Sequence, residues 1–344
     1  MASFRAWLQL TRAHTAPLEM LISLMGAALG AGGLLSPALA HFTLLGFLYH
    51  LTGYGQNSVE DFVRGYDRRD PHKAHHPLQR GAMTVEEARG GVKVLFAGTL
   101  FYALYLSHLR PLPLLLLLLV LISGLIYNVK GKSIHFKFLP IALAHSTLFP
   151  FAYFSSGGPV GGETLHIMLL GYGFLILQIT YQILIEGDIK DLQVKEASLL
   201  KRMGVRLKGG VLKVPVRVQL MGLSLKASSL LLALLIWHLL EDSLSALPLL
   251  LLFSSLALLF HVRLLKNGPF DHEGALKDMA LEEVSSTFLL LSALSPLYHP
   301  TLGPLLALLL VLLSLSYFAI MNRFLWGTSL TPVSYTHLTL PTKA

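Results

Sequence analysis

Cysteine is absent from the 344 residues, and charged side chains are scarce. Without cysteine the chain has no disulfide framework and no thiolate that could bind a metal or act as a nucleophile. Only 13% of the residues are charged, whereas soluble proteins average about 25%. Because so few charges cannot cover a water-exposed surface, the composition excludes an ordinary soluble enzyme.

Long apolar runs take the place of the missing charge, and 53% of the residues are hydrophobic. A membrane-spanning helix needs about 20 mostly apolar residues. Ten blocks meet this requirement, at residues 14–36, 38–56, 91–109, 111–128, 138–156, 164–185, 216–240, 244–264, 281–298 and 302–322. The sequence therefore predicts an all-α, polytopic helical bundle in a membrane.

The basic residues indicate how the bundle is oriented. Nearly all of the 27 lysines and arginines fall in alternate connections between the blocks, and such connections face the cytoplasm in membrane proteins. We therefore expect an integral protein of the cell membrane, with its N-terminus and its long loops cytoplasmic. The net charge of +8 is then explained by contact with membrane lipid, and no nucleic-acid partner is predicted.

The two ends of the chain differ from the body. The first residues lack the pattern of a cleaved signal peptide and lead directly into the first block. The last stretch, residues 331–344, resembles translated sequencing-adapter read-through. We therefore expect one domain over residues 1–330, followed by a non-native tail.

Two inner connections, residues 57–90 and 186–215, are long and rich in charge, and long loops in compact bundles often carry function. At the start of the first loop, Asn57, Glu60 and Asp61 are spaced to lie on one side of a helix end. Carboxylate and amide oxygens suit Mg²⁺, which is usually held by one or two carboxylates together with substrate phosphates. These residues are therefore candidate magnesium ligands.

Basic residues and histidines follow in the same loop. Lys73, His76 and Arg80 are predicted to bind the phosphate oxygens that the metal leaves free. The alternative is a zinc site made by His72, His75 and His76, although zinc normally takes four nitrogen or sulfur ligands.

The second loop carries Asp188 and Asp191, three residues apart, with Lys190 between them. Two acidic clusters that face each other would bind a diphosphate through bridging Mg²⁺. Such a site stabilises the charge of a departing pyrophosphate without proton transfer.

These motifs resemble the signatures of the UbiA prenyltransferases. Asn57 and Asp61 followed by Asp67, and then His76-Pro77-Leu78 and Gly81, are similar to the first signature, and the second loop is similar to the second Asp-rich signature. Tyr127 with Lys130 and Lys132 resembles a third conserved region. The sequence departs from the family pattern at Ser58 and Lys195, where the family commonly has acids, and in the spacing to Asp67.

The resemblance implies nine family helices plus a tenth, a central cavity and Mg²⁺-dependent transfer of a prenyl chain from a polyprenyl diphosphate. Asp61, Asp188 and Asp191 would be the catalytic acids. The implied metal ligands are Asn57, Glu60, Asp61, Asp67, Asp188 and Asp191. The implied diphosphate contacts are Lys73, His76, Arg80, Lys130, Lys132 and Lys190.

The acceptor is expected to be aromatic, of the quinone-precursor type, or else a glycerol-phosphate lipid. A cation-coupled transporter and a non-catalytic binder of prenyl lipids are the alternatives from other functional classes. Transporters place ionisable sites near the membrane midplane, whereas the acids here cluster at the inner surface.

Four residues are candidates for the substrate pocket. Tyr54, Tyr127 and Tyr181 lie near the predicted inner ends of helices. Two roles explain this position equally well: membership of the aromatic belt at the membrane surface, and stabilisation of an allylic cation. His145 lies in the fifth block and either lines the pocket or is a satisfied buried histidine. Lys226 lies inside the seventh block. Two interpretations remain for it: a functional charge within the membrane, or a side chain that snorkels to the membrane surface.

Overall fold

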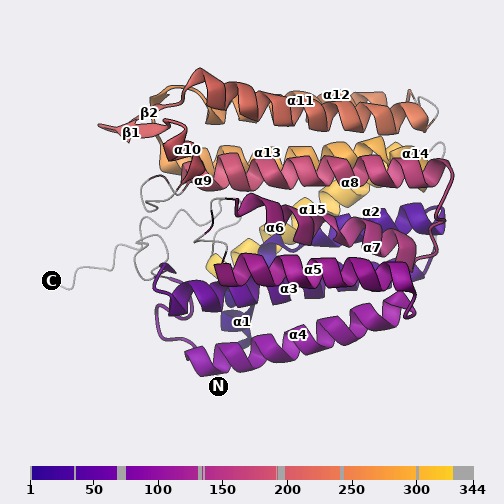
Figure 1. Ribbon diagram of the computed structural model, residues 1–344, viewed down its shortest axis with the longest axis horizontal. Helices are drawn as coiled ribbons and strands as arrows, with labels where there is room; N and C mark the ends of the chain where they lie inside the picture. The colour runs from indigo at the N-terminus through magenta and orange to yellow at the C-terminus, as the bar shows by residue number, and fades with distance from the viewer. Residues whose placement is uncertain are drawn as a thin grey trace.

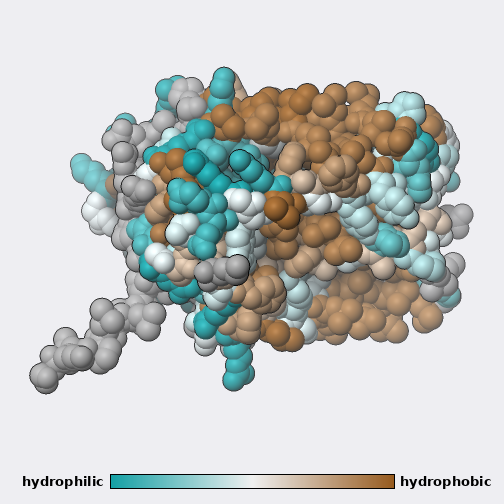
Figure 2. All heavy atoms as spheres, turned by 90° about the horizontal axis from the view of Figure 1, so that it is seen from below, coloured by the Kyte–Doolittle hydropathy of each residue, from teal (hydrophilic) through white to brown (hydrophobic). Residues whose placement is uncertain are grey.

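The computed structural model describes residues 2–34, 36–67, 75–130, 134, 136–190, 192, 198–240, 244–299 and 302–327. Long helices run side by side along one direction, and both the N-terminus and the small β-sheet lie at one end of the bundle (Figure 1). Hydrophobic residues cover the middle of the face shown in Figure 2, and hydrophilic residues gather mainly at that same end. The distribution fits an apolar belt in a membrane with a polar surface at one end of the bundle.

The first half of the bundle contains a short entry segment and then seven helices. They are α1 (Phe4–Leu10), the 3-10 turn η1 (Ala13–Thr15), α2 (Pro17–Ala31), α3 (Ala38–Val63), α4 (Val85–Ser107), α5 (Pro111–Lys130), α6 (Phe138–Ser146), α7 (Leu148–Ser155) and α8 (Glu163–Tyr181). The residues at the N-termini of several helices explain where those helices begin. Pro17 occupies the first turn of α2, and Thr84 and Glu87 form a capping box at the start of α4.

The second half begins with a π-helical turn, η4 (Gln182–Glu186), that continues α8. It contains α9 (Gly187–Lys190), α10 (Leu199–Arg202), β1 (Arg206–Lys208), β2 (Val211–Lys213), α11 (Val216–Leu239), α12 (Leu247–Leu264), β3 (Gly268–Pro269), α13 (His272–Ala293), α14 (Ser295–Tyr298) and α15 (Gly303–Trp326). The antiparallel strands β1 and β2 are joined by Gly209 and Gly210, both with positive φ. This two-glycine turn is typical of a tight hairpin, and it lies within the predicted loop 186–215.

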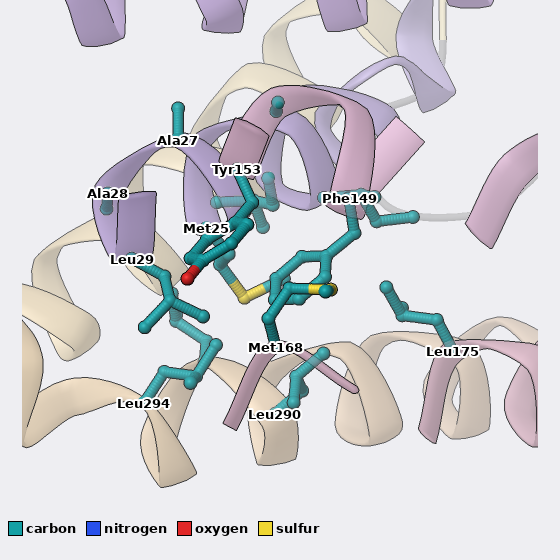
Figure 3. Packing of buried hydrophobic residues seen from close by; sticks show 14 of the residues in the cluster. Met25, Ala27, Ala28, Leu29, Phe149, Tyr153, Met168, Leu175, Leu290 and Leu294 are labelled. Carbon is teal, nitrogen blue, oxygen red and sulfur yellow. The ribbon is translucent and has the colours of Figure 1, made fainter. Parts of the chain in front are cut away.

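The main core lies where helices from both halves meet. Figure 3 shows Met25 of α2, Phe149 and Tyr153 of α7, Met168 of α8 and Leu290 of α13 converging. α2 packs against both α3 and α7. A Cβ atom at Gly26 would lie 2.2 Å from the Phe149 carbonyl oxygen, so glycine is needed for this close approach of two backbones.

The all-α membrane fold predicted from the sequence is confirmed. Each of the ten predicted blocks coincides with helix, and within the described residues seven helical segments are long and apolar enough to cross a membrane. The number of spans, ten, stays a prediction. Two boundaries differ: α3 continues to Val63, so the whole first signature up to that residue is helical, and α13 begins at His272, where Asp271 caps it.

Lys226 does not snorkel to the membrane surface. Its side chain is buried, pairs with Glu282 and donates to Gln178 Oε1 at 2.6 Å and to Ser286 Oγ at 3.2 Å. Its ammonium lies 3.9 Å from the centre of the Tyr181 ring. The lysine therefore joins α11 to α8 and α13 inside the protein. The predicted tail, residues 331–344, lies outside the described residues.

Candidate functional site

The C-terminal end of α3 presents two candidate metal ligands together. Asn57 and Asp61 are one helical turn apart, and the Asn57 amide donates to Asp61 Oδ2 at 3.2 Å. Asp61 is buried, whereas Glu60 is partly exposed and pairs with Arg64 at 3.3 Å. Among Asn57, Glu60 and Asp61, it is therefore Asn57 and Asp61 that form a pair facing the protein interior. Their oxygen atoms are the donors that Mg²⁺ prefers.

Ser58, the departure from the family signature, points away from this pair. Its side chain is fully buried, and its hydroxyl donates to the Leu10 carbonyl oxygen of α1 at 2.9 Å. The residue after Asn57 therefore serves to dock α1 on α3. The Asn57–Asp61 pair does not depend on an acid at this position.

We expect Ser58→Asp to destabilise the protein, because the new carboxylate would face a carbonyl oxygen in a buried place without a donor. The cost of an unsatisfied buried charge is several kcal/mol. Thermal denaturation of the purified protein in detergent measures this effect. Ser58→Ala is the matched control and should lower stability by only about 1 kcal/mol. If Ser58→Asp is as stable as wild type, the side chain at this position is not enclosed against α1, and the prediction is wrong.

After α3 the chain forms a short turn. Asp67 is buried at the end of this turn. The predicted phosphate ligand Lys73 and the zinc candidate His72 lie outside the described residues. Within them, His76 is buried, and the exposed Arg80 donates to Gln9 Oε1 of α1. Arg80 therefore holds the loop against α1, and its phosphate-binding role stays a prediction.

The second acidic loop begins where α8 ends in the π-helical turn η4, a distortion that is frequent at functional sites. Asp188 follows in α9 and is buried. Its Oδ1 lies 2.6 Å from Lys137 Nζ, and its Oδ2 accepts from Ser198 Oγ at 2.8 Å and from the Leu200 amide at 3.4 Å. Asp188 therefore organises this loop and holds a cation beside it.

The remaining candidates of the second loop are distributed differently. Lys190 is exposed at the end of α9. Asp191 lies outside the described residues, as does Lys132 of the connection between α5 and α6. Lys137, which the motif reasoning did not select, is the cation that contacts Asp188.

Several contacts bring the two acidic regions to one part of the bundle. Asn128 of α5 donates to Gln56 of α3 at 3.1 Å, which places the α5 end with Tyr127 and Lys130 beside the first signature. Lys137, directly before α6, lies beside Asp188 of α9, and α6 packs against α5. The end of α5 and the start of α6 therefore link the C-terminal end of α3 to α9.

The predicted pocket residues divide between two polar networks. Tyr54 and His145 lie together, with ring centres 6.4 Å apart, close to Glu19 and His50. Tyr181 belongs instead to the Lys226 network, where its hydroxyl lies 2.9 Å from His261 Nδ1. Sequence reasoning missed Glu19 and His50. The available signal was an acid and a histidine inside apolar blocks, where ionisable residues tend to be functional.

Metal ligands are not preassembled in the described part of the chain. No group of three or more histidine, aspartate or glutamate side chains there is arranged to hold a metal ion.

Comparisons with known proteins agree with the motifs. The model of the UbiA prenyltransferase family matches residues 20–281. Comparison with curated proteins by sequence gives no match.

Solved structures show the same fold at low sequence identity. A digeranylgeranylglyceryl phosphate synthase superposes with a TM-score of 0.61 at 16% identity, covering 85% of this chain and 98% of that one. A UbiA homologue from Aeropyrum pernix K1 has a TM-score of 0.55 at 18% identity, covering 79% and 94%. A UbiA homologue from Archaeoglobus fulgidus bound to DMAPP and Mg²⁺ has a TM-score of 0.52 at 18% identity, covering 83% and 98%.

Proposed function

Because this chain belongs to the UbiA prenyltransferase family, we propose that it transfers a prenyl chain from a polyprenyl diphosphate to an acceptor within the membrane. The observation that carries the proposal is the pairing of Asn57 with Asp61 at one inner helix end and of Asp188 with Lys137 at another. The Asn128–Gln56 hydrogen bond joins α5 to α3, and Lys137, which precedes the next helix α6, lies beside Asp188. An amide–carboxylate pair and a carboxylate–cation pair are suited to a diphosphate bound through a metal.

The diphosphate would lie between the two acidic regions. Asn57 and Asp61 are the proposed ligands of Mg²⁺ on one side, with Asp67 nearby, and Asp188 and Asp191 are the ligands on the other. When bound, Mg²⁺ stabilises the negative charge that develops on pyrophosphate as the allylic C–O bond breaks.

The cations of the site complete the phosphate binding. Lys137 already lies beside Asp188, and Lys130 ends the helix whose Asn128 contacts α3. Together with Lys190 they place positive charge around the proposed diphosphate position. Binding the diphosphate would require Lys137 to share its contact between Asp188 and a phosphate oxygen.

The prenyl tail and the acceptor would lie on the membrane side of the diphosphate. Tyr54 is one turn further into the membrane than Asn57 on the same helix, so its ring would face the allylic carbon and exclude water there. We propose an aromatic acceptor; a glycerol-phosphate lipid, the type of acceptor suggested by the name of one structural neighbour, is the second candidate. The orientation with the N-terminus and both acidic loops in the cytoplasm follows from the distribution of lysine and arginine.

Turnover by the purified protein in nanodiscs tests the proposal. Radiolabelled geranylgeranyl diphosphate is supplied with 4-hydroxybenzoate, dihydroxynaphthoate and geranylgeranylglyceryl phosphate, in Mg²⁺ or in EDTA. We expect a labelled lipid product that forms in Mg²⁺ and is lost in EDTA, and its identity names the acceptor. Diphosphate that is retained but never transferred would indicate a non-catalytic binder, and neither binding nor transfer would favour the transporter alternative.

A further inference from the structure

A buried carboxylate with a histidine on each side lies deeper in the membrane than the acidic loops. Glu19 of α2 has its Oε2 2.7 Å from His50 Nδ1 and its Oε1 3.0 Å from His145 Nδ1. The Glu19 side chain is 1% exposed. Gly46, one turn before His50, permits this arrangement, since a Cβ there would lie 2.4 Å from the Glu19 carbonyl oxygen.

The two histidines differ in what their second nitrogen does. His50 Nε2 lies 3.0 Å from the Arg12 carbonyl oxygen and 3.3 Å from Thr15 Oγ1, and its side chain is fully buried. His50 is therefore satisfied on both sides and has a structural role. His145 contacts Glu19 through Nδ1 alone, and no contact of its Nε2 with another polar atom is found among the residues that the structure describes; its side chain is 18% exposed.

His145 lies beside the helix that carries the first two proposed metal ligands. His50, Tyr54, Asn57 and Asp61 follow one another along one face of α3, at helical spacings of four, three and four residues. His145 packs edge-on against Tyr49 and Tyr54, with ring centres 5.5 and 6.4 Å apart. Since a helix rises about 1.5 Å per residue, His50 lies roughly 10 Å along α3 from Asn57 and roughly 16 Å from Asp61.

We propose that His145 is the general base that accepts the proton of the acceptor's hydroxyl group, with Glu19 as its positioning residue. A histidine held at one nitrogen by a buried carboxylate and open at the other is the usual arrangement of such a base. This inference rests on the proposed prenyl transfer and adds to it the requirement for a hydroxyl-bearing acceptor.

The reaction balances as follows. The allylic C–O bond breaks and pyrophosphate leaves with the bonding electron pair, while the acceptor's O–H proton passes to His145 Nε2. In an alcohol, the oxygen electron pair forms the new bond to the allylic carbon. In a phenol, the pair is delivered through the adjacent ring carbon, whose hydrogen then moves to the oxygen. In both cases one proton resides on His145, where the negative charge of Glu19 stabilises it.

The test compares His145→Gln and Glu19→Gln with wild type in nanodiscs, measuring prenyl product and pyrophosphate release separately. We expect His145→Gln to lower kcat for transfer by about 100-fold or more, with little change in the KM for geranylgeranyl diphosphate. Added imidazole should restore part of the transfer activity of His145→Ala, which a purely structural role would not allow. His166→Gln, an exposed histidine of α8, is the matched control and should transfer like wild type.

The outcomes separate this inference from the proposed function. Wild-type transfer together with near wild-type kcat in His145→Gln, or with no imidazole rescue of His145→Ala, would overturn the general-base role alone. Absence of transfer by wild type with every hydroxyl acceptor would overturn the proposed function and this inference together. Equal loss of transfer and of diphosphate binding in His145→Gln would also overturn it, since a base acts only after the diphosphate is bound.

Discussion

Asp61→Asn is expected to abolish prenyl transfer while leaving the fold intact. The substitution keeps the size of the side chain and its contact with Asn57, which is 3.2 Å away, but it removes the negative charge that would hold Mg²⁺ against the diphosphate. Losing one group that stabilises charge in a transition state typically costs 10²–10³ in kcat, so we expect a fall of at least about 100-fold. The measurement is product formation from labelled geranylgeranyl diphosphate at saturating Mg²⁺.

Asp188→Asn and a control variant complete this experiment. Asparagine at 188 can still accept from Ser198 and from the Leu200 amide, but it loses the charge that attracts Lys137 and the metal, so a loss of similar size is expected. Glu86→Gln removes the same charge from the exposed first turn of α4 and should leave transfer unchanged. Full activity of either aspartate variant would remove that residue from the proposed metal site.

Lys226→Met is expected to produce the largest loss of stability. The lysine is buried and pairs with Glu282, which would be left as an uncompensated carboxylate in the bundle interior. Removing one partner of a buried pair typically costs about 3–5 kcal/mol. Thermal denaturation in detergent, followed by circular dichroism at 222 nm, should show a markedly lower midpoint than wild type.

The double variant Lys226→Met with Glu282→Met tests whether the cost comes from the unpaired charge. Replacing both partners by apolar residues of similar size is often neutral, so the double variant should recover most of the stability. Lys208→Met, an exposed lysine of β1, is the control and should denature like wild type. A single variant as stable as wild type would contradict the structural role of this pair.

The fold was predictable because the membrane makes apolar length informative. Every predicted block coincides with helix, since a backbone in lipid must satisfy its hydrogen bonds within the helix. The hairpin at residues 206–213 was missed because its strands are only three residues long and depend on a Gly-Gly turn. The start of α13 was placed late because its first turns are polar and lie before the apolar stretch.

The site was less predictable, for a physical reason visible in particular residues. Motif spacing selected Asn57, Asp61 and Asp188 as candidates because each lies among other acids or amides near a helix end, and their roles stay a prediction. It could not identify Lys137 as the partner of Asp188 or Glu282 as the partner of Lys226, because these pairs join residues 51 and 56 positions apart. Spacing also could not separate Glu60 from Asp61, whereas the contact of Glu60 with Arg64 does.

Retention of a diphosphate that cannot react tests the central claim most directly. The wild-type protein in nanodiscs is incubated with a labelled geranylgeranyl thiodiphosphate in Mg²⁺ or in EDTA, and the bound label is counted. A site formed by the acids of both loops predicts saturable retention in Mg²⁺ that EDTA removes. Equal retention in both conditions, or none in either, would contradict a magnesium-linked diphosphate site at the inner end of this bundle.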